Sequence, residues 1–177
     1  MQSSGSFEPT PANVSLMRIL LSCFGVIAII AYGVFGAMLM SNWAIAAASE
    51  VPLATAIADM EAAHQPYSTT PGIIFAVLGT LLALGWGILM LIRNSPFSDW
   101  AGASLWAVVI MLGAPAYFFA SFSNLMSVGD TYYEWNSGAA FALEAPLYMA
   151  SGISFVFLVG SFIVVMIKST VRRQRPP

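Results

Sequence analysis

Four long apolar runs constrain what this chain can fold into more than any other feature of its sequence. They cover residues 19–40, 72–92, 103–122 and 147–167, and none contains Asp, Glu, Lys, Arg or His. Because a helix rises about 1.5 Å per residue, about 20 residues cross a hydrocarbon core of about 30 Å. The chain is 59% hydrophobic and 8% charged, whereas about a quarter of the residues in soluble proteins are charged. The sequence therefore predicts an all-α membrane protein with four antiparallel transmembrane helices.

The segments between the runs divide the chain further. Residues 1–17 are polar and rich in Pro, Gly and Ser, which is typical of a flexible tail, and residues 171–177 form a basic tail. A four-helix transmembrane domain is expected between them, over residues 18–170. Its spans are predicted at about 19–42, 72–92, 101–124 and 146–168. Since the connections are short, consecutive spans should be neighbours that run in opposite directions.

Basic residues predict how this domain is oriented. With four spans, all of them fall on one side of the membrane, namely Arg18, Arg93, Lys168, Arg172, Arg173 and Arg175. The positive-inside rule makes that side cytoplasmic, so we expect a protein of the cell membrane with both termini in the cytoplasm. Most of the acids are expected in the two outer loops, namely Glu50, Asp59, Glu61, Asp130, Glu134 and Glu144.

The first outer loop contains a helical pattern. Pro52 suits the first turn of a helix, and Leu53, Ile57 and Met60 then recur at helical spacing. This pattern predicts a short amphipathic helix that lies on the outer face of the membrane. The sequence "AIAAASE" just before it resembles a signal-peptide cleavage site, but the apolar run that precedes it is longer than the core of an ordinary signal peptide.

The second outer loop carries the most polar and aromatic stretch of the chain, "GDTYYEWNSG" at residues 129–138. Tyr and Trp rings favour the membrane interface, so one interpretation is an anchor at the membrane edge. The other is a partner-contact surface, because such aromatic residues are enriched at protein interfaces and the two acids are not needed for lipid contact. The candidate contact residues are Asp130, Tyr132, Tyr133, Glu134 and Trp135.

The second span has a face of small residues. They recur three or four positions apart, namely Gly72, Ala76, Gly79, Ala83 and Gly87. Small side chains let two membrane helices approach closely, so this face predicts helix packing, either within the chain or with another subunit. Weaker versions of the pattern occur at Gly33 with Ala37 and at Gly152 with Gly160.

Pro115 lies in the middle of the third span. Proline removes one backbone hydrogen bond and predicts a bend in the helix there. Such a bend can mark a gate or a ligand cavity, and it can equally serve ordinary packing.

The residues that support chemistry are few. Glu61 and His64 have the Glu-x-x-His spacing of di-iron sites, but the motif occurs once and His64 is the single histidine. We therefore expect no metal site, no cofactor and no enzymatic activity. A quinone or lipid between the helices would need only an apolar cleft and a polar group such as Tyr32, Tyr117 or Tyr148. The net charge of −2 leaves no basic surface for nucleic acid.

These observations favour a protein whose partners are the lipid bilayer and other integral membrane subunits. We expect a non-catalytic accessory or assembly subunit of a larger membrane complex, for example a respiratory complex. The alternatives are a small channel or transporter for a neutral or apolar solute, and a membrane enzyme that acts on lipid through Glu61, His64 or Asp130.

Overall fold

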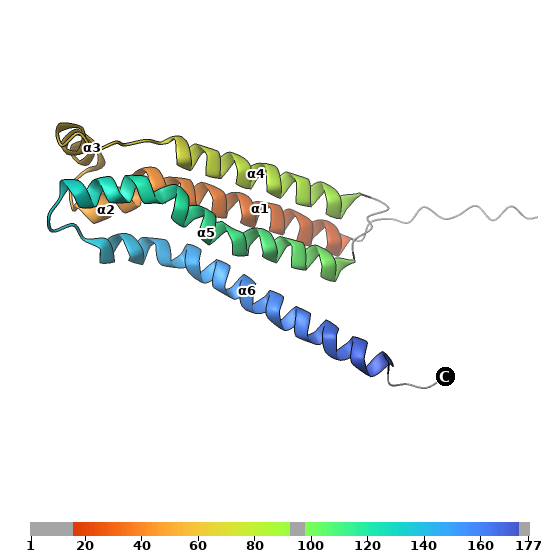
Figure 1. The fold of residues 1–177 in the computed structure, drawn as a ribbon. Coiled ribbons are helices and arrows are strands. Elements are labelled where there is room, and N and C mark those ends of the chain that lie inside the picture. Colours follow the sequence, from red (N-terminus) through yellow and green to blue (C-terminus); the bar gives the residue numbers. More distant parts are fainter. Residues whose placement is uncertain (1–15, 93–97, 174–177) are drawn as a thin grey trace, which may run out of the picture.

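The computed structural model describes residues 16–92 and 98–173, and the secondary structure of these residues consists of helices, with no strand among them. The elements, in chain order, are α1 (Leu16–Met38), the π-helical turn η1 (Leu39–Trp43), α2 (Ala44–Ser49), α3 (Leu53–Ala62), α4 (Thr70–Leu91), α5 (Asp99–Thr131) and α6 (Ser137–Arg173). Figure 1 shows α1, α4 and α5 lying side by side, with α3 across one end.

Four helical segments are long and apolar enough to cross a membrane. They are Leu16–Ser49, Thr70–Leu91, Asp99–Thr131 and Ser137–Thr170. The predictions of an all-α fold and of a multi-pass membrane protein are thus confirmed.

Three of these helical segments extend well beyond the apolar runs, and the first does so through η1 and α2 to Ser49. Helix α5 continues to Thr131, past the span expected at about 101–124, and α6 begins at Ser137, before the span expected at about 146–168. The apolar runs reflect contact with lipid, whereas a helix continues as long as its backbone hydrogen bonds are made. The segment that begins α6 is rich in alanine, the best helix former, and the side chain of Asn136 caps it by accepting a hydrogen bond from Ala139 N at 2.9 Å.

This extension corrects one expectation. The sequence predicts Glu144 in an outer loop, but the residue lies within α6 and is only 5% exposed. The proline two residues after it, Pro146, lies inside α6 as well. Proline is tolerated in membrane helices, so it does not start the helix here.

Some expected features lie outside the described residues. These are Arg93, Arg175, most of the tail at residues 1–17 and residues 174–177 of the basic tail. The backbone of α6 continues through Arg173, so the first three residues of the expected tail at 171–177 are helical.

Helices α1 and α4 make the closest contact of the bundle. A Cβ added to Gly79 would lie 3.5 Å from Gly33 Cα, and one added to Gly72 would lie 2.9 Å from Ala37 O. The start of α4 thus lies beside the end of α1. Glycine at these positions lets the two backbones touch with no side chain between them.

A polar network holds together the end of the bundle that carries α2 and α3, which we call the cap end. Asn124 of α5 is 3% exposed, and its amide nitrogen donates to Met40 O at 2.9 Å and to Ser68 O at 2.8 Å. Its amide oxygen accepts from Ser68 N at 3.0 Å. Tyr67 donates to Ser41 O at 2.8 Å. These bonds attach the segment between α3 and α4 to α5 and to the π-helical turn.

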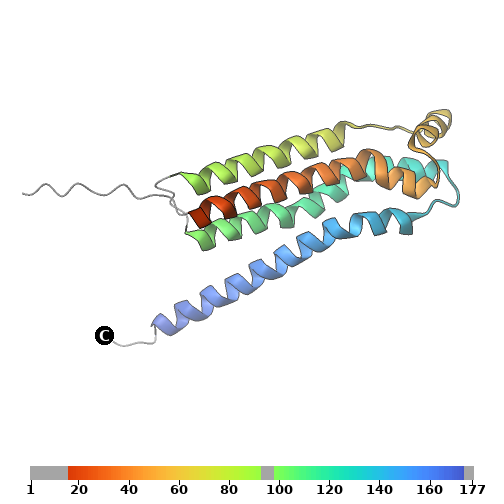
Figure 2. The ribbon, with the colours of Figure 1, turned by 180° about the vertical axis from the view of Figure 1, so that it is seen from behind.

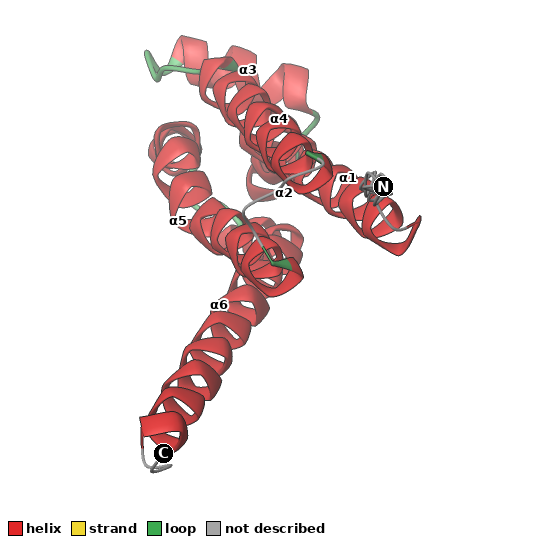
Figure 3. Cartoon of the chain, turned by 90° about the vertical axis from the view of Figure 1, so that its right-hand side faces the viewer, coloured by secondary structure: helices red, strands yellow, loops and turns green. Residues whose placement is uncertain are grey.

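Helix α6 follows a different course from the other three long helices. It begins beside α5 at the cap end and diverges from α1, α4 and α5 toward its C-terminus (Figure 2), and a side view shows it pointing away from them (Figure 3). Contact with the bundle is therefore concentrated in its first half, where Ala140, Glu144, Leu147 and Ser151 are buried.

Candidate functional site

The polar stretch at residues 129–138 does not form one surface. Tyr133 is 98% exposed, and Glu134 and Asp130 are exposed as well. Tyr132 is half-buried and donates a hydrogen bond to Asp59 Oδ2 of α3 at 2.6 Å. Burial, together with the hydrogen bond to and negative charge of Asp59, raises the pKa of Tyr132 to about 12.

Trp135 and Asn136 complete the connection between α5 and α6. The Trp135 ring lies against Gly129, where an added Cβ would come within 3.3 Å of it. Asn136 N donates to Ala48 O at 2.7 Å, and its side chain donates to Glu50 Oε1 at 2.6 Å. Of the five candidate contact residues, Asp130, Tyr133 and Glu134 are exposed, whereas Tyr132 and Trp135 make contacts within the fold.

The small residues of α4 lie toward α1. Gly72 and Gly79 make the close approaches described above, a Cβ on Gly87 would overlap Val26 of α1, and Ala83 is fully buried. Ala76 lies near Gly33. Within the chain this face is therefore already occupied by α1.

Pro115 lies inside α5 next to an apolar cavity of about 260 Å³ between α1, α4 and α5. Leu112, Gly113 and Ala116 of α5 contribute to its lining, and Tyr32 contributes from α1. The helix continues through the proline to Thr131.

Glu144 is the centre of a polar cluster that joins α6 to its neighbours. Tyr117 of α5 is fully buried and donates to Glu144 Oε1 at 2.8 Å. Two turns further along α6, Ser151 Oγ donates to Ile110 O at 2.7 Å and lies 2.9 Å from the hydroxyl of Tyr32. These bonds connect α6 to α5 and α1 across apolar surroundings, where polar groups need partners.

A groove between α5 and α6 leads to Glu144, and we call it the α5–α6 groove. It has a volume of about 450 Å³. Its lining combines this acid with five aromatic side chains, namely Phe118, Phe122, Trp135, Phe141 and Tyr148. Phe122 and Phe141 are 52% and 62% exposed, so the groove opens on the outer surface of the bundle.

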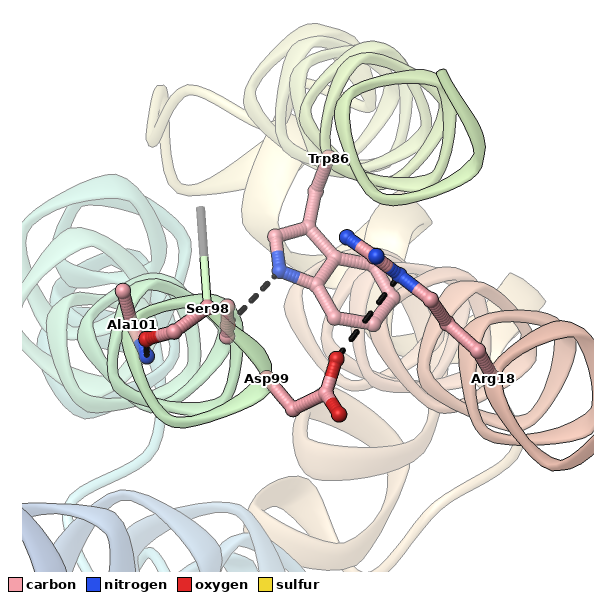
Figure 4. Close-up of polar contacts among 6 residues, drawn as sticks. Arg18, Trp86, Ser98, Asp99 and Ala101 are labelled. Atoms are coloured by element: carbon pink, nitrogen blue, oxygen red, sulfur yellow. Dashed lines mark hydrogen bonds and ion pairs between the residues drawn. The ribbon is translucent and has the colours of Figure 1, made fainter. Parts of the chain in front are cut away.

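A second polar contact lies at the opposite end of the bundle. Arg18 Nε lies 3.7 Å from Asp99 Oδ1, and Figure 4 shows the two side chains directed toward each other beside Trp86. Trp86 Nε1 donates to Gly102 O at 2.9 Å. Ser98 caps α5 by accepting from Ala101 N at 3.2 Å. With these contacts, α1, α4 and α5 are held together around an apolar cavity of about 250 Å³.

No group of three or more potential metal ligands occurs within the described residues. Glu61 and His64 are exposed at the end of α3, and His64 adopts the left-handed conformation, with φ of 57°, that commonly terminates helices. The Glu-x-x-His spacing therefore does not lie on one helix, because α3 ends at Ala62.

The sequence analysis does not single out Glu144 as a binding residue, although the helical spacing that relates it to other polar residues is present in the sequence. Glu144, Tyr148 and Ser151 are spaced by four and three residues, so they share one face of a helix if the helix starts early enough. Assigning the helix only to the apolar run separated the acid from the two other polar residues.

Comparison with known proteins adds no family to this description. The chain matches no family model, no curated protein and no solved structure. The class of the protein, a multi-pass membrane protein, therefore follows from its own helices.

Proposed function

We propose that this protein is a non-catalytic accessory or assembly subunit that binds other integral membrane proteins. In this proposal the four long helices are antiparallel, α3 lies on the outer face of the cell membrane, and both termini are cytoplasmic. The positive-inside pattern of the basic residues supports that orientation.

The observation that carries the proposal is the course of α6. It diverges from the bundle toward its C-terminus, although Phe157 still contacts Trp100 of α5 with 5.5 Å between the ring centroids. Large apolar side chains of this part are exposed on several sides, as at Val156 and Phe162, which are 69% and 66% exposed. Gly152 and Gly160 lie about two turns apart on this helix, and no described atom lies within 4 Å of a Cβ placed on either. Membrane helices associate through small residues of this kind. A helix from a partner subunit has room to pack against them.

Purification of the tagged protein from its native membranes in a mild detergent tests this proposal. Native mass measurement should find it in a stoichiometric complex with larger membrane subunits. Gly160→Leu should remove those subunits, because the bulky side chain would occupy the space that the partner helix needs.

A matched control is available on α4. Gly85 also has open space around its Cβ position, so Gly85→Leu should leave the complex intact. A wild-type protein that purifies alone as a monomer, or equal partner loss in both variants, would contradict the proposal.

The cavity beside Pro115 supports a second candidate function, a small channel or transporter for a neutral or apolar solute. A cavity of about 260 Å³ between α1, α4 and α5 is lined almost entirely by apolar residues. Proline weakens the backbone hydrogen bonding of α5 next to it and allows the helix to bend during transport.

Flux measurements in reconstituted vesicles distinguish this function from the first. A transporter should move a small neutral solute faster than empty vesicles do, and Pro115→Ala should slow that flux. Absence of flux across a panel of neutral solutes would eliminate this candidate.

A further inference from the structure

An acidic side chain at the base of an aromatic groove is an unusual combination in a membrane helix. Glu144 is 5% exposed and lies in the α5–α6 groove among the rings of Phe118, Phe122, Trp135, Phe141 and Tyr148. We propose that this groove binds a monovalent organic cation with apolar substituents, such as a quaternary ammonium or phosphonium ion. This inference does not depend on the proposed partner subunits.

The acid in the groove favours a cation. The hydroxyl of Tyr117 donates to Glu144 Oε1 at 2.8 Å, and a cation bound beside this buried acid would favour its carboxylate form. No Lys, Arg or His is among the described residues that line the groove. A bound cation would supply the opposite charge that an acid in a membrane helix normally has.

The aromatic walls favour a cation with apolar substituents over a hydrated metal ion. Phe118 and Phe122 of α5 have ring centroids 6.1 Å apart, and Phe141 and Tyr148 of α6 are stacked at 5.9 Å with an angle of 24° between their planes. Faces of aromatic rings attract organic cations, and the attraction grows when the cation is desolvated. A small metal ion would lose its water without gaining enough oxygen ligands.

The size and the opening of the groove are consistent with this class of ligand. Its volume is about 450 Å³, which is within the range of small-molecule sites. The exposed rings of Phe122 and Phe141 border it on the side that faces lipid. A lipophilic cation that has partitioned into the membrane would thus reach Glu144 without crossing the bundle.

Equilibrium binding of tetraphenylphosphonium to the full chain, purified in the uncharged detergent dodecyl maltoside, tests the proposal. Tetraphenylborate is the matched probe, because it has a similar size and shape but the opposite charge. The phosphonium ion should bind saturably at one site per chain, and the borate ion should not. Glu144→Gln should weaken phosphonium binding by about tenfold or more, since loss of a desolvated charge contact is expected to cost at least that factor.

Three variants make the experiment decisive. The Glu144→Gln variant removes the charge but retains a side-chain oxygen that can accept the hydrogen bond of Tyr117. Glu134→Gln is the control for loss of a charge elsewhere, because Glu134 is exposed and does not line the groove. If Glu144→Gln fails to fold, Phe122→Leu replaces it, since that ring is half-exposed, and binding should weaken about threefold or more. Equal binding of the two probes would overturn the proposal. So would unchanged affinity in a folded Glu144→Gln or Phe122→Leu protein, or an equal loss in Glu134→Gln.

Discussion

Two helix pairs of the bundle pack through side chains of very different size. Helices α1 and α4 meet through small residues, whereas α5 and α6 meet through large aromatic and polar side chains. Gly33 and Gly79 bring α1 and α4 so close that a Cβ on Gly79 would lie 3.5 Å from the facing backbone. Helices α5 and α6 meet instead through Tyr117 and Glu144, with large rings on either side. The first contact brings the two backbones together, with the cavity of about 260 Å³ beside it toward α5, whereas the second leaves a groove of about 450 Å³ between the two helices themselves.

The difference shows how side-chain size determines what a membrane helix pair can do. Small residues maximise van der Waals contact between backbones, which is the main source of helix association in lipid. Aromatic side chains hold the backbones apart and leave polar groups between them that need partners. We therefore interpret the α1–α4 contact as structural and the α5–α6 contact as the place for binding.

The largest expected effect comes from filling the α1–α4 contact. Gly79→Leu should destabilise the protein by about 1–3 kcal/mol, because a larger side chain has to separate two packed backbones. Denaturant titration of the detergent-purified protein, followed by circular dichroism, measures this change. Gly85→Leu on α4 is the control, since its Cβ position is open. Equal destabilisation by the two variants would refute the close α1–α4 contact.

A smaller effect is expected at the α5–α6 contact. Tyr117→Phe removes the hydroxyl that donates to Glu144 and should cost about 1–2 kcal/mol, because a buried acceptor loses a partner. The same denaturant titration measures it. Tyr133→Phe removes the hydroxyl of a side chain that is 98% exposed and should have no effect. If Tyr117→Phe also left the free energy of unfolding unchanged, the polar cluster would not hold α6 to α5.

The smallest effect concerns the connection between α5 and α6. Tyr132→Phe removes the hydrogen bond to Asp59 and should cost at most about 1 kcal/mol. Because the folded pKa of Tyr132 is raised to about 12, its stabilising contribution is complete below about pH 10 and is lost as the pH rises through about 12. Stability measurements at about pH 6 and about pH 9 should give the same difference between variant and wild type. A difference that changes between these two pH values would contradict this assignment.

Several features of the fold follow from the sequence alone, and others do not. The apolar runs predict the four long helices, and Ser98 before Asp99 predicts the start of α5. The positions of helix ends at the cap end were harder to predict. Helix α6 starts before Glu144, and the stretch at 129–138 separates into Tyr133 on the surface and Trp135 in the groove. These outcomes depend on contacts with distant segments, such as the hydrogen bond from Asn136 N to Ala48 O.

The sequence by itself determined that this is a multi-pass helical membrane protein, because the length and hydropathy of a span are local properties of the chain. Only the tertiary structure decided that Glu144 meets Tyr117 and that α6 diverges from the bundle toward its C-terminus. Which faces of two helices meet depends on the fit of many side chains at once, and that fit is distributed over residues far apart in the sequence.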